Sequence, residues 1–232
     1  SRVTLGNVLY CGSEYAITAN FETCEFINCG KSSFETIIKI DNFYSTANLT
    51  NCYFAFDISE VSSKVIDATI ANTIITDCTF NKCGAINVEV KSSKGIFEYR
   101  NNVASSLTQQ FLCITNIGSQ PIISDNVFQN SHVHNEYFIS FFHSLDKIYL
   151  ENNTFTNCIA STDNDVIIYG GAISLWIQKA GYSQEEIIFN QCKFFDNENH
   201  HSLGIPAQGG AFQLGYTSSV ANTSVEFNEC EF

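Results

Sequence analysis

A nine-residue stretch recurs along the chain, most clearly as Phe21-Glu-Thr-Cys24-Glu-Phe26-Ile-Asn-Cys29, Ile75-Thr-Asp-Cys78-Thr-Phe80-Asn-Lys-Cys83 and Leu150-Glu-Asn-Asn153-Thr-Phe155-Thr-Asn-Cys158. Each copy has an apolar residue, a Cys or Asn three positions later and, except in the degenerate copy that ends at Ala104, a Phe two positions after that. We call the Cys or Asn the first repeat position. It occurs at residues 24, 52, 78, 102, 126, 153, 192 and 230. Recurrence at a nearly constant interval indicates a repeat architecture.

The intervals between first repeat positions are 28, 26, 24, 24, 27, 39 and 38 residues. Each copy alternates apolar and polar residues, as a short strand with one buried face does. A second strand-like stretch follows in most intervals, at residues 37–40, 85–90, 111–114, 137–141, 172–176 and 211–214. A propeller blade needs about 40 residues, which most intervals lack, and no leucine-rich ladder is present. We therefore predict an all-β, right-handed parallel β-helix of about eight coils.

Equivalent residues on neighbouring coils of such a solenoid stack about 4.8 Å apart. We expect the first repeat positions to form one inward-facing column, and the Phe residues two positions later to form a parallel aromatic column. Asn replaces Cys in three copies, which a disulfide position would not tolerate, so the pattern predicts buried free thiols. Zinc is not expected either, because the recurring Cys-x4-Cys spacing follows one strand and its turn. The columns contain Cys24, Cys52, Cys78, Asn102 and Asn126, and Phe26, Phe54, Phe80 and Phe128.

Composition restricts the function. The chain is 44% hydrophobic and 15% charged, which is typical of a folded protein. A net charge of −13 with 11 Lys and Arg disfavours nucleic acid or an anionic membrane as a partner. No run of about 18 apolar residues predicts a membrane span. We expect no cofactor and no metal, since His132, His134, His200 and His201 are interpreted as solvated loop residues. The segment Thr162-Asp163-Asn164-Asp165 lacks the Gly and Glu of a calcium loop.

The pair of motifs Phe194-Phe-Asp-Asn197 and Gly209-Gly210-Ala211-Phe212, with Gly170-Gly171-Ala172-Ile173, resembles the repeat of the polymorphic outer membrane protein family. The resemblance is specific in the last third of the chain. It covers the rest through the Phe motif, where most copies have Cys or a small residue in place of Asn. It implies a right-handed β-helical surface protein that presents an adhesive surface.

No catalytic residues are predicted, because the acidic residues are scattered and no paired carboxylates of a glycoside hydrolase are visible. The leading hypothesis is a non-enzymatic extracellular or cell-surface β-helix that recognises a protein or glycan on another cell or in an extracellular assembly. The alternatives are a structural coat or filament that self-assembles through coil ends or flanks, and a carbohydrate-active lyase or hydrolase. Three sequons are compatible with secretion and glycosylation, at Asn48, Asn152 and Asn222.

The two long intervals gain most of their extra length at one corner, within Ile159–Tyr169 and Glu198–Gln208. Because equivalent corners stack, these insertions should lie side by side as a raised loop patch, where recognition commonly occurs. We predict a partner surface there with Asp163, Asp165, His200 and His201 exposed. Residues 1–232 are expected to form a single β-helix segment of a longer chain, because Phe232 follows Cys230 without the rest of a coil or a cap.

Overall fold

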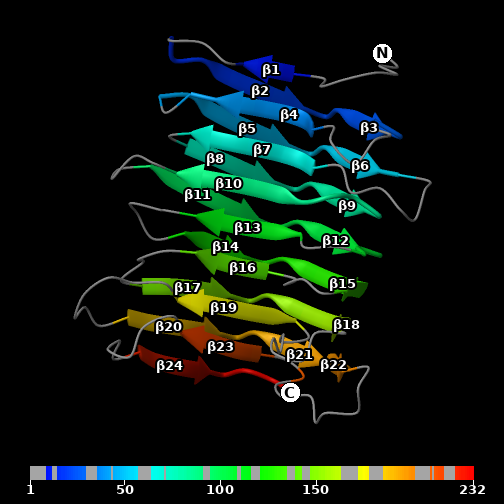
Figure 1. Ribbon diagram of the computed structural model, residues 1–232, viewed down its shortest axis with the longest axis vertical. Coiled ribbons are helices and arrows are strands. Elements are labelled where there is room, and N and C mark those ends of the chain that lie inside the picture. The colour runs from blue at the N-terminus through cyan, green and yellow to red at the C-terminus, as the bar shows by residue number, and fades with distance from the viewer. Residues whose placement is uncertain are drawn as a thin grey trace.

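The computed structural model describes residues 9–11, 15–29, 36–42, 44–56, 64–70, 72–90, 95–108, 111–115, 121–134, 139–142, 147–162, 172–177, 185–201, 210, 212–216 and 223–232. Regular structure within these residues consists of strands alone, and the strands pair in parallel. The chain runs through three sheets in turn and winds into a solenoid (Figure 1). The prediction of an all-β parallel β-solenoid is confirmed.

The three sheets are named here in the order in which the chain visits them. Sheet A contains β1 (Leu9–Cys11), β4 (Thr36–Asp41), β7 (Lys64–Ile70), β10 (Ile86–Val90), β13 (Leu112–Thr115) and β16 (Ile139–Phe142). Sheet B contains β2 (Thr18–Glu22), β5 (Thr46–Thr50), β8 (Asn72–Thr76), β11 (Ile96–Arg100), β14 (Ile122–Ser124), β17 (Lys147–Glu151), β20 (Glu185–Asn190) and β24 (Thr223–Asn228).

Sheet C contains β3 (Glu25–Ile27), β6 (Tyr53–Ala55), β9 (Thr79–Asn81), β12 (Val103–Ser105), β15 (Val127–His134), β18 (Thr154–Thr162) and β21 (Lys193–Phe195), and β22 (Glu198–His201) also pairs with β18. A further pair, β19 (Ile173–Ile177) with β23 (Phe212–Tyr216), follows beside β16. The second strand-like stretches of the sequence therefore belong to sheet A and to this pair.

The repeated motif is two strands joined by a tight corner, so its interpretation as one strand was wrong. The residue before each first repeat position has a positive φ, for example 53° at Asn51 and 56° at Asp77, which turns the chain from sheet B into sheet C. Asn and Asp are among the non-glycine residues that tolerate this conformation best. A second corner of the same kind follows β3, β9, β12 and β21, with positive φ at Asn28, Lys82, Ser106 and Asp196.

The inward column is confirmed. Five of its members between residues 52 and 153 are at most 2% exposed, and Cys192 is fully buried. The aromatic column is confirmed as well. Phe26 and Phe54 stack with ring centroids 4.6 Å apart, and Phe54 and Phe80 at 5.0 Å. Farther along, Phe128 stacks on Phe155 at 4.8 Å. Because each Phe follows the corner by two residues, both columns point into the same core.

The second corner shows why a glycine occurs in the double-glycine motif. A Cβ atom placed on Gly210 would lie 2.8 Å from the backbone oxygen of Asn197, which is closer than real Cβ contacts. The Asn197 side chain meanwhile accepts a hydrogen bond from the Cys158 amide at 3.0 Å and donates one to the Phe155 carbonyl at 3.0 Å. The Phe-x-x-Asn and Gly-Gly motifs are thus in direct contact.

Candidate functional site

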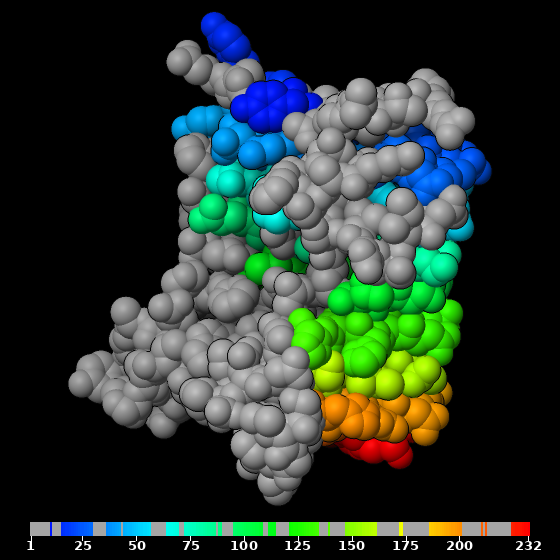
Figure 2. All heavy atoms as spheres, turned by 45° about the vertical axis from the view of Figure 1, so that its right-hand side comes forward, coloured from blue at the N-terminus to red at the C-terminus, as the bar shows by residue number. Residues whose placement is uncertain are grey.

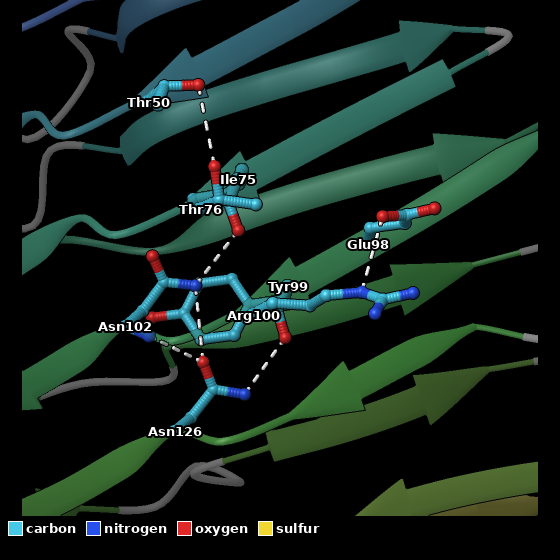
Figure 3. Close-up of polar contacts among 8 residues, drawn as sticks. All are labelled: Thr50, Ile75, Thr76, Glu98, Tyr99, Arg100, Asn102 and Asn126. Atoms are coloured by element: carbon cyan, nitrogen blue, oxygen red, sulfur yellow. Dashed lines mark hydrogen bonds and ion pairs between the residues drawn. The ribbon is translucent and has the colours of Figure 1, made fainter.

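The inward column is a ladder of hydrogen bonds in which Cys and Asn side chains make equivalent bonds. Asn102 accepts from the amide of Cys78 at 2.8 Å. It donates to the carbonyl of Ile75 at 3.0 Å (Figure 3). Cys78 likewise accepts from the amide of Cys52 at 3.4 Å, and the Cys52 thiol donates to Phe21 at 3.5 Å. A thiol and a carboxamide each offer a donor and an acceptor, so the two residues exchange freely.

The buried thiols, those of the ladder and that of Cys158, are not suited to nucleophilic chemistry. The nine cysteines whose side chains the structure describes are free. Burial raises the pKa of the Cys78 and Cys158 thiols to about 12, and that of Cys192 to about 11. Since the thiolate is the reactive form, these cysteines serve packing and hydrogen bonding.

The outer side of the first corner carries a column of polar side chains at the positive-φ positions. Neighbouring members are joined across coils. Asn101 donates to Asp77, and Asn152 donates to Asp125 at 2.8 Å. From Asn51 to Asn152, carboxylates and amides therefore alternate along this column at the strand spacing of about 4.8 Å. Figure 2 shows the neighbouring face of sheet C, where residues of successive coils stack from blue to red.

A depression of about 660 Å³ lies at the middle of this corner. Eight of its nine lining residues are polar, and Arg100 contributes the cationic group. Arg100 Nε lies 3.3 Å from Glu98 Oε2 (Figure 3). Strand β11 presents Arg100 from sheet B, and the corner itself presents the acids and amides. The lining residues are Thr76, Asp77, Arg100, Asn101, Asp125, Asn126, Val127, Asn152 and Thr154.

The predicted loop patch is partly described. Residues Ile159–Thr162 and Glu198–His201 do lie side by side, but as paired parallel strands, so their prediction as loops was wrong. The physical reason is that β15 already extends to His134 and offers β18 an edge to pair with. His132 and His134 lie in β15, so the interpretation of these two as loop residues was also wrong.

The outer face of β15, β18 and β22 gathers imidazoles around one hydroxyl. His132 Nε2 lies 2.8 Å from Ser161 Oγ, and His134 Nδ1 lies 2.9 Å from the same atom. Ser161 pairs in register with His134 on one side and His200 on the other. His200 Nε2 lies 2.5 Å from Glu198 Oε2, and both side chains are 57% exposed.

The other predicted residues are more scattered. Asn152 is exposed and lies in the depression. Asn48 is half-buried in β5, and its amide donates to Asn20 at 2.8 Å. Asp163, Asp165 and Asn222 lie outside the described residues, as does the side chain of His201. Among the described residues, no three His, Cys, Asp or Glu side chains are grouped to hold a metal as they stand, and no helix could cross a membrane.

Comparison with known proteins gives no relative. No family model, curated protein or solved structure matches this chain. The resemblance to the polymorphic outer membrane protein repeat stays a prediction.

Sequence reasoning missed the depression and the role of His132 and His134. A signal for the depression was available, because the residue before every first repeat position is polar: Thr23, Asn51, Asp77, Asn101, Asp125, Asn152, Gln191 and Glu229. For the histidines, the alternation Ser131-His132-Val133-His134 could have been interpreted as a strand with both imidazoles on one face.

Proposed function

We propose that this chain is a non-enzymatic recognition module of an extracellular or cell-surface protein, and that it binds a glycan in the depression at the first corner. The supporting observation is the lining. Asp77, Asn101, Asp125 and Asn152 present acids and amides in a fixed repeat beside Arg100. Carboxylates, amides and guanidinium groups are suitable partners for the many hydroxyls of a sugar.

The lining favours a glycan over a protein partner. Val127 is its single apolar side chain, whereas the centre of a stable protein interface is largely apolar and aromatic. The scaffold is also rigid where the ligand would sit. Each corner is fixed from inside by ladder residues such as Asn126, which is 1% exposed, so little ordering would oppose binding.

The test is binding to an array of neutral and acidic oligosaccharides. Asp77→Asn/Asp125→Asn removes both carboxylates while keeping a residue type that tolerates the positive φ of 56° and 59° at these positions. We expect at least a tenfold loss of affinity. Asp67→Asn/Glu226→Gln removes the same charge from β7 and β24 and should bind like the unmodified chain. Equal binding by the Asp77→Asn/Asp125→Asn variant would refute the proposal.

The same experiment separates the competing functions. Asp77 and Asp125 are two coils apart, or about 9.6 Å at the strand spacing, which is near the upper end for an inverting hydrolase at about 6.5 to 9.5 Å. Release of reducing ends from a bound oligosaccharide would establish the hydrolase instead. Sedimentation of the purified chain at rising concentration tests the coat or filament alternative, which predicts progressive assembly where the recognition module stays at one size.

A further inference from the structure

The outer face of β15, β18 and β22 combines three features that a transition-metal site needs. His132 and His134 are two residues apart on a strand, so both imidazoles lie on one face. Both rings direct a nitrogen to one point, the Oγ atom of Ser161, at 2.8 and 2.9 Å. The side chains of His132 and His134 are exposed, so an ion can reach this point from solvent.

The hydrogen bonds around Ser161 allow an imidazole lone pair to be directed there. The hydroxyl has one hydrogen and also lies 3.4 Å from the Val133 carbonyl. It can therefore donate to one acceptor at a time, and between neutral rings at least one imidazole must itself donate to Oγ. When the hydroxyl donates to the other imidazole, that ring offers its lone pair to the point between them. A metal ion there would take the lone pairs of both.

His200 and Glu198 add a third ligand with a supporting group. His200 is the in-register neighbour of Ser161 on β22, about 4.8 Å away along the sheet. Its Nε2 lies 2.5 Å from a Glu198 oxygen, which leaves Nδ1 as the nitrogen for a metal. A carboxylate that holds the second nitrogen of a ligating imidazole is the usual support in metal sites.

We propose that His132 Nε2, His134 Nδ1 and, after rotation of its ring, His200 Nδ1 bind one divalent transition-metal ion beside Ser161. Imidazole nitrogen suits Zn²⁺, Ni²⁺ and Cu²⁺. Metal–nitrogen bonds of about 2.1 Å would bring the His132 and His134 nitrogens closer to the ion than they lie to Ser161 Oγ, at 2.8 and 2.9 Å. The inference does not rest on the proposed glycan recognition, because it concerns a different face and different residues.

The experiment is calorimetric titration of the whole chain with Ni²⁺, which thiols do not reduce, at neutral pH. We expect one ion per chain. His132→Gln/His134→Gln should weaken binding at least tenfold, and His200→Gln several-fold. His143→Gln removes an imidazole that lies outside the described residues and serves as the matched control.

His132, His134 and His200 are on the surface, so circular dichroism should show an unchanged fold in the variants that replace them. Undiminished Ni²⁺ affinity in His132→Gln/His134→Gln would overturn the site. A loss of the same size in His143→Gln would overturn it too, because binding would then reflect imidazoles in general. Undiminished affinity in His200→Gln would overturn the assignment of the third ligand. Competition of Ni²⁺ by Zn²⁺ should follow the same order of variants.

Discussion

Replacement of Asn126 tests whether the inward ladder holds the solenoid together. Asn126 is 1% exposed. Its Oδ1 accepts from the Asn102 amide at 2.9 Å, and its Nδ2 donates to the Tyr99 carbonyl at 2.9 Å and to Asn153 Oδ1 at 2.9 Å. In Asn126→Ala the Asn102 amide and the Tyr99 carbonyl lose these partners inside the core. Each unsatisfied buried group costs about 1–3 kcal/mol, so unfolding should become easier by about 2–6 kcal/mol.

Asn126→Cys separates hydrogen bonding from packing. A thiol at this position can accept and donate as Cys78 and Cys52 do two and three coils closer to the N-terminus. We therefore expect Asn126→Cys to cost about 1 kcal/mol, while Asn126→Leu, which keeps side-chain volume but offers no polar group, costs about as much as Ala. Ser105→Ala in β12, on the preceding coil, removes a half-buried outward hydroxyl and should cost less than about 0.5 kcal/mol.

The measurement is equilibrium unfolding in urea, with hydrogen exchange of the Asn102 amide as a local reading of the same bond. Exchange at Asn102 should accelerate in Asn126→Ala and Asn126→Leu and stay slow in Asn126→Cys. If Asn126→Cys were as unstable as Asn126→Ala, the equivalence of thiol and carboxamide would be refuted. If Asn126→Ala lost less than about 1 kcal/mol, the ladder would contribute little.

Three further results are expected. Tyr99→Phe should raise the free energy of unfolding by about 1–2 kcal/mol, seen as a higher melting temperature, because the fully buried Tyr99 hydroxyl has no hydrogen-bond partner among the described residues; a lower melting temperature would contradict this. Phe54→Ala should cost about 3–5 kcal/mol in urea unfolding, because it opens the stack between Phe26 and Phe80, whereas Tyr53→Ala on the outer face should cost far less. The free energy of unfolding should fall as pH rises from about 9 to about 12, because burial raises the pKa of the Cys78 and Cys158 thiols in the folded chain from 9.0 to about 12. The unfolded chain therefore loses these protons first, and each thiol lowers the free energy of unfolding by about 1.4 kcal/mol per pH unit. A flat profile under reducing conditions would contradict this.

The repeat predicted the fold because its chemistry is local and recurs. The alternation of apolar and polar residues identifies buried positions, and the first five intervals, of 24 to 28 residues, leave room for short strands and tight corners only. What the interval could not show was the corner inside the motif. Positive φ at Asn51 and Asp77 belongs to single residues, and an Asn or Asp in a polar sequence has many other uses.

The candidate sites were harder to predict, because their residues come from different coils and strands. Asp77 and Asp125 are 48 positions apart in the sequence. They line one depression because they occupy equivalent positions on coils that stack in register, two coils apart. Nothing in the sequence around Ser161 marks it as a site residue. Only the strand register, which places it between His134 and His200, identifies it as one.

Ala104 shows the same limit inside the core. It occupies the position of the stacked Phe residues, and in the sequence this copy looks merely degenerate. In the structure, the rings of Tyr99 and Phe111 fill the space that Ala104 leaves. Tyr99 lies 6.1 Å from Phe80 and 6.0 Å from Phe128, and Phe111 contacts Phe80 at 5.4 Å. A core must be filled to near-crystalline density, so a small residue in one sheet requires large ones from the neighbouring sheets. This packing also explains why the Tyr99 hydroxyl has no hydrogen-bond partner among the described residues. The Tyr99 ring enters an apolar column from sheet B, and its hydroxyl is buried there with it.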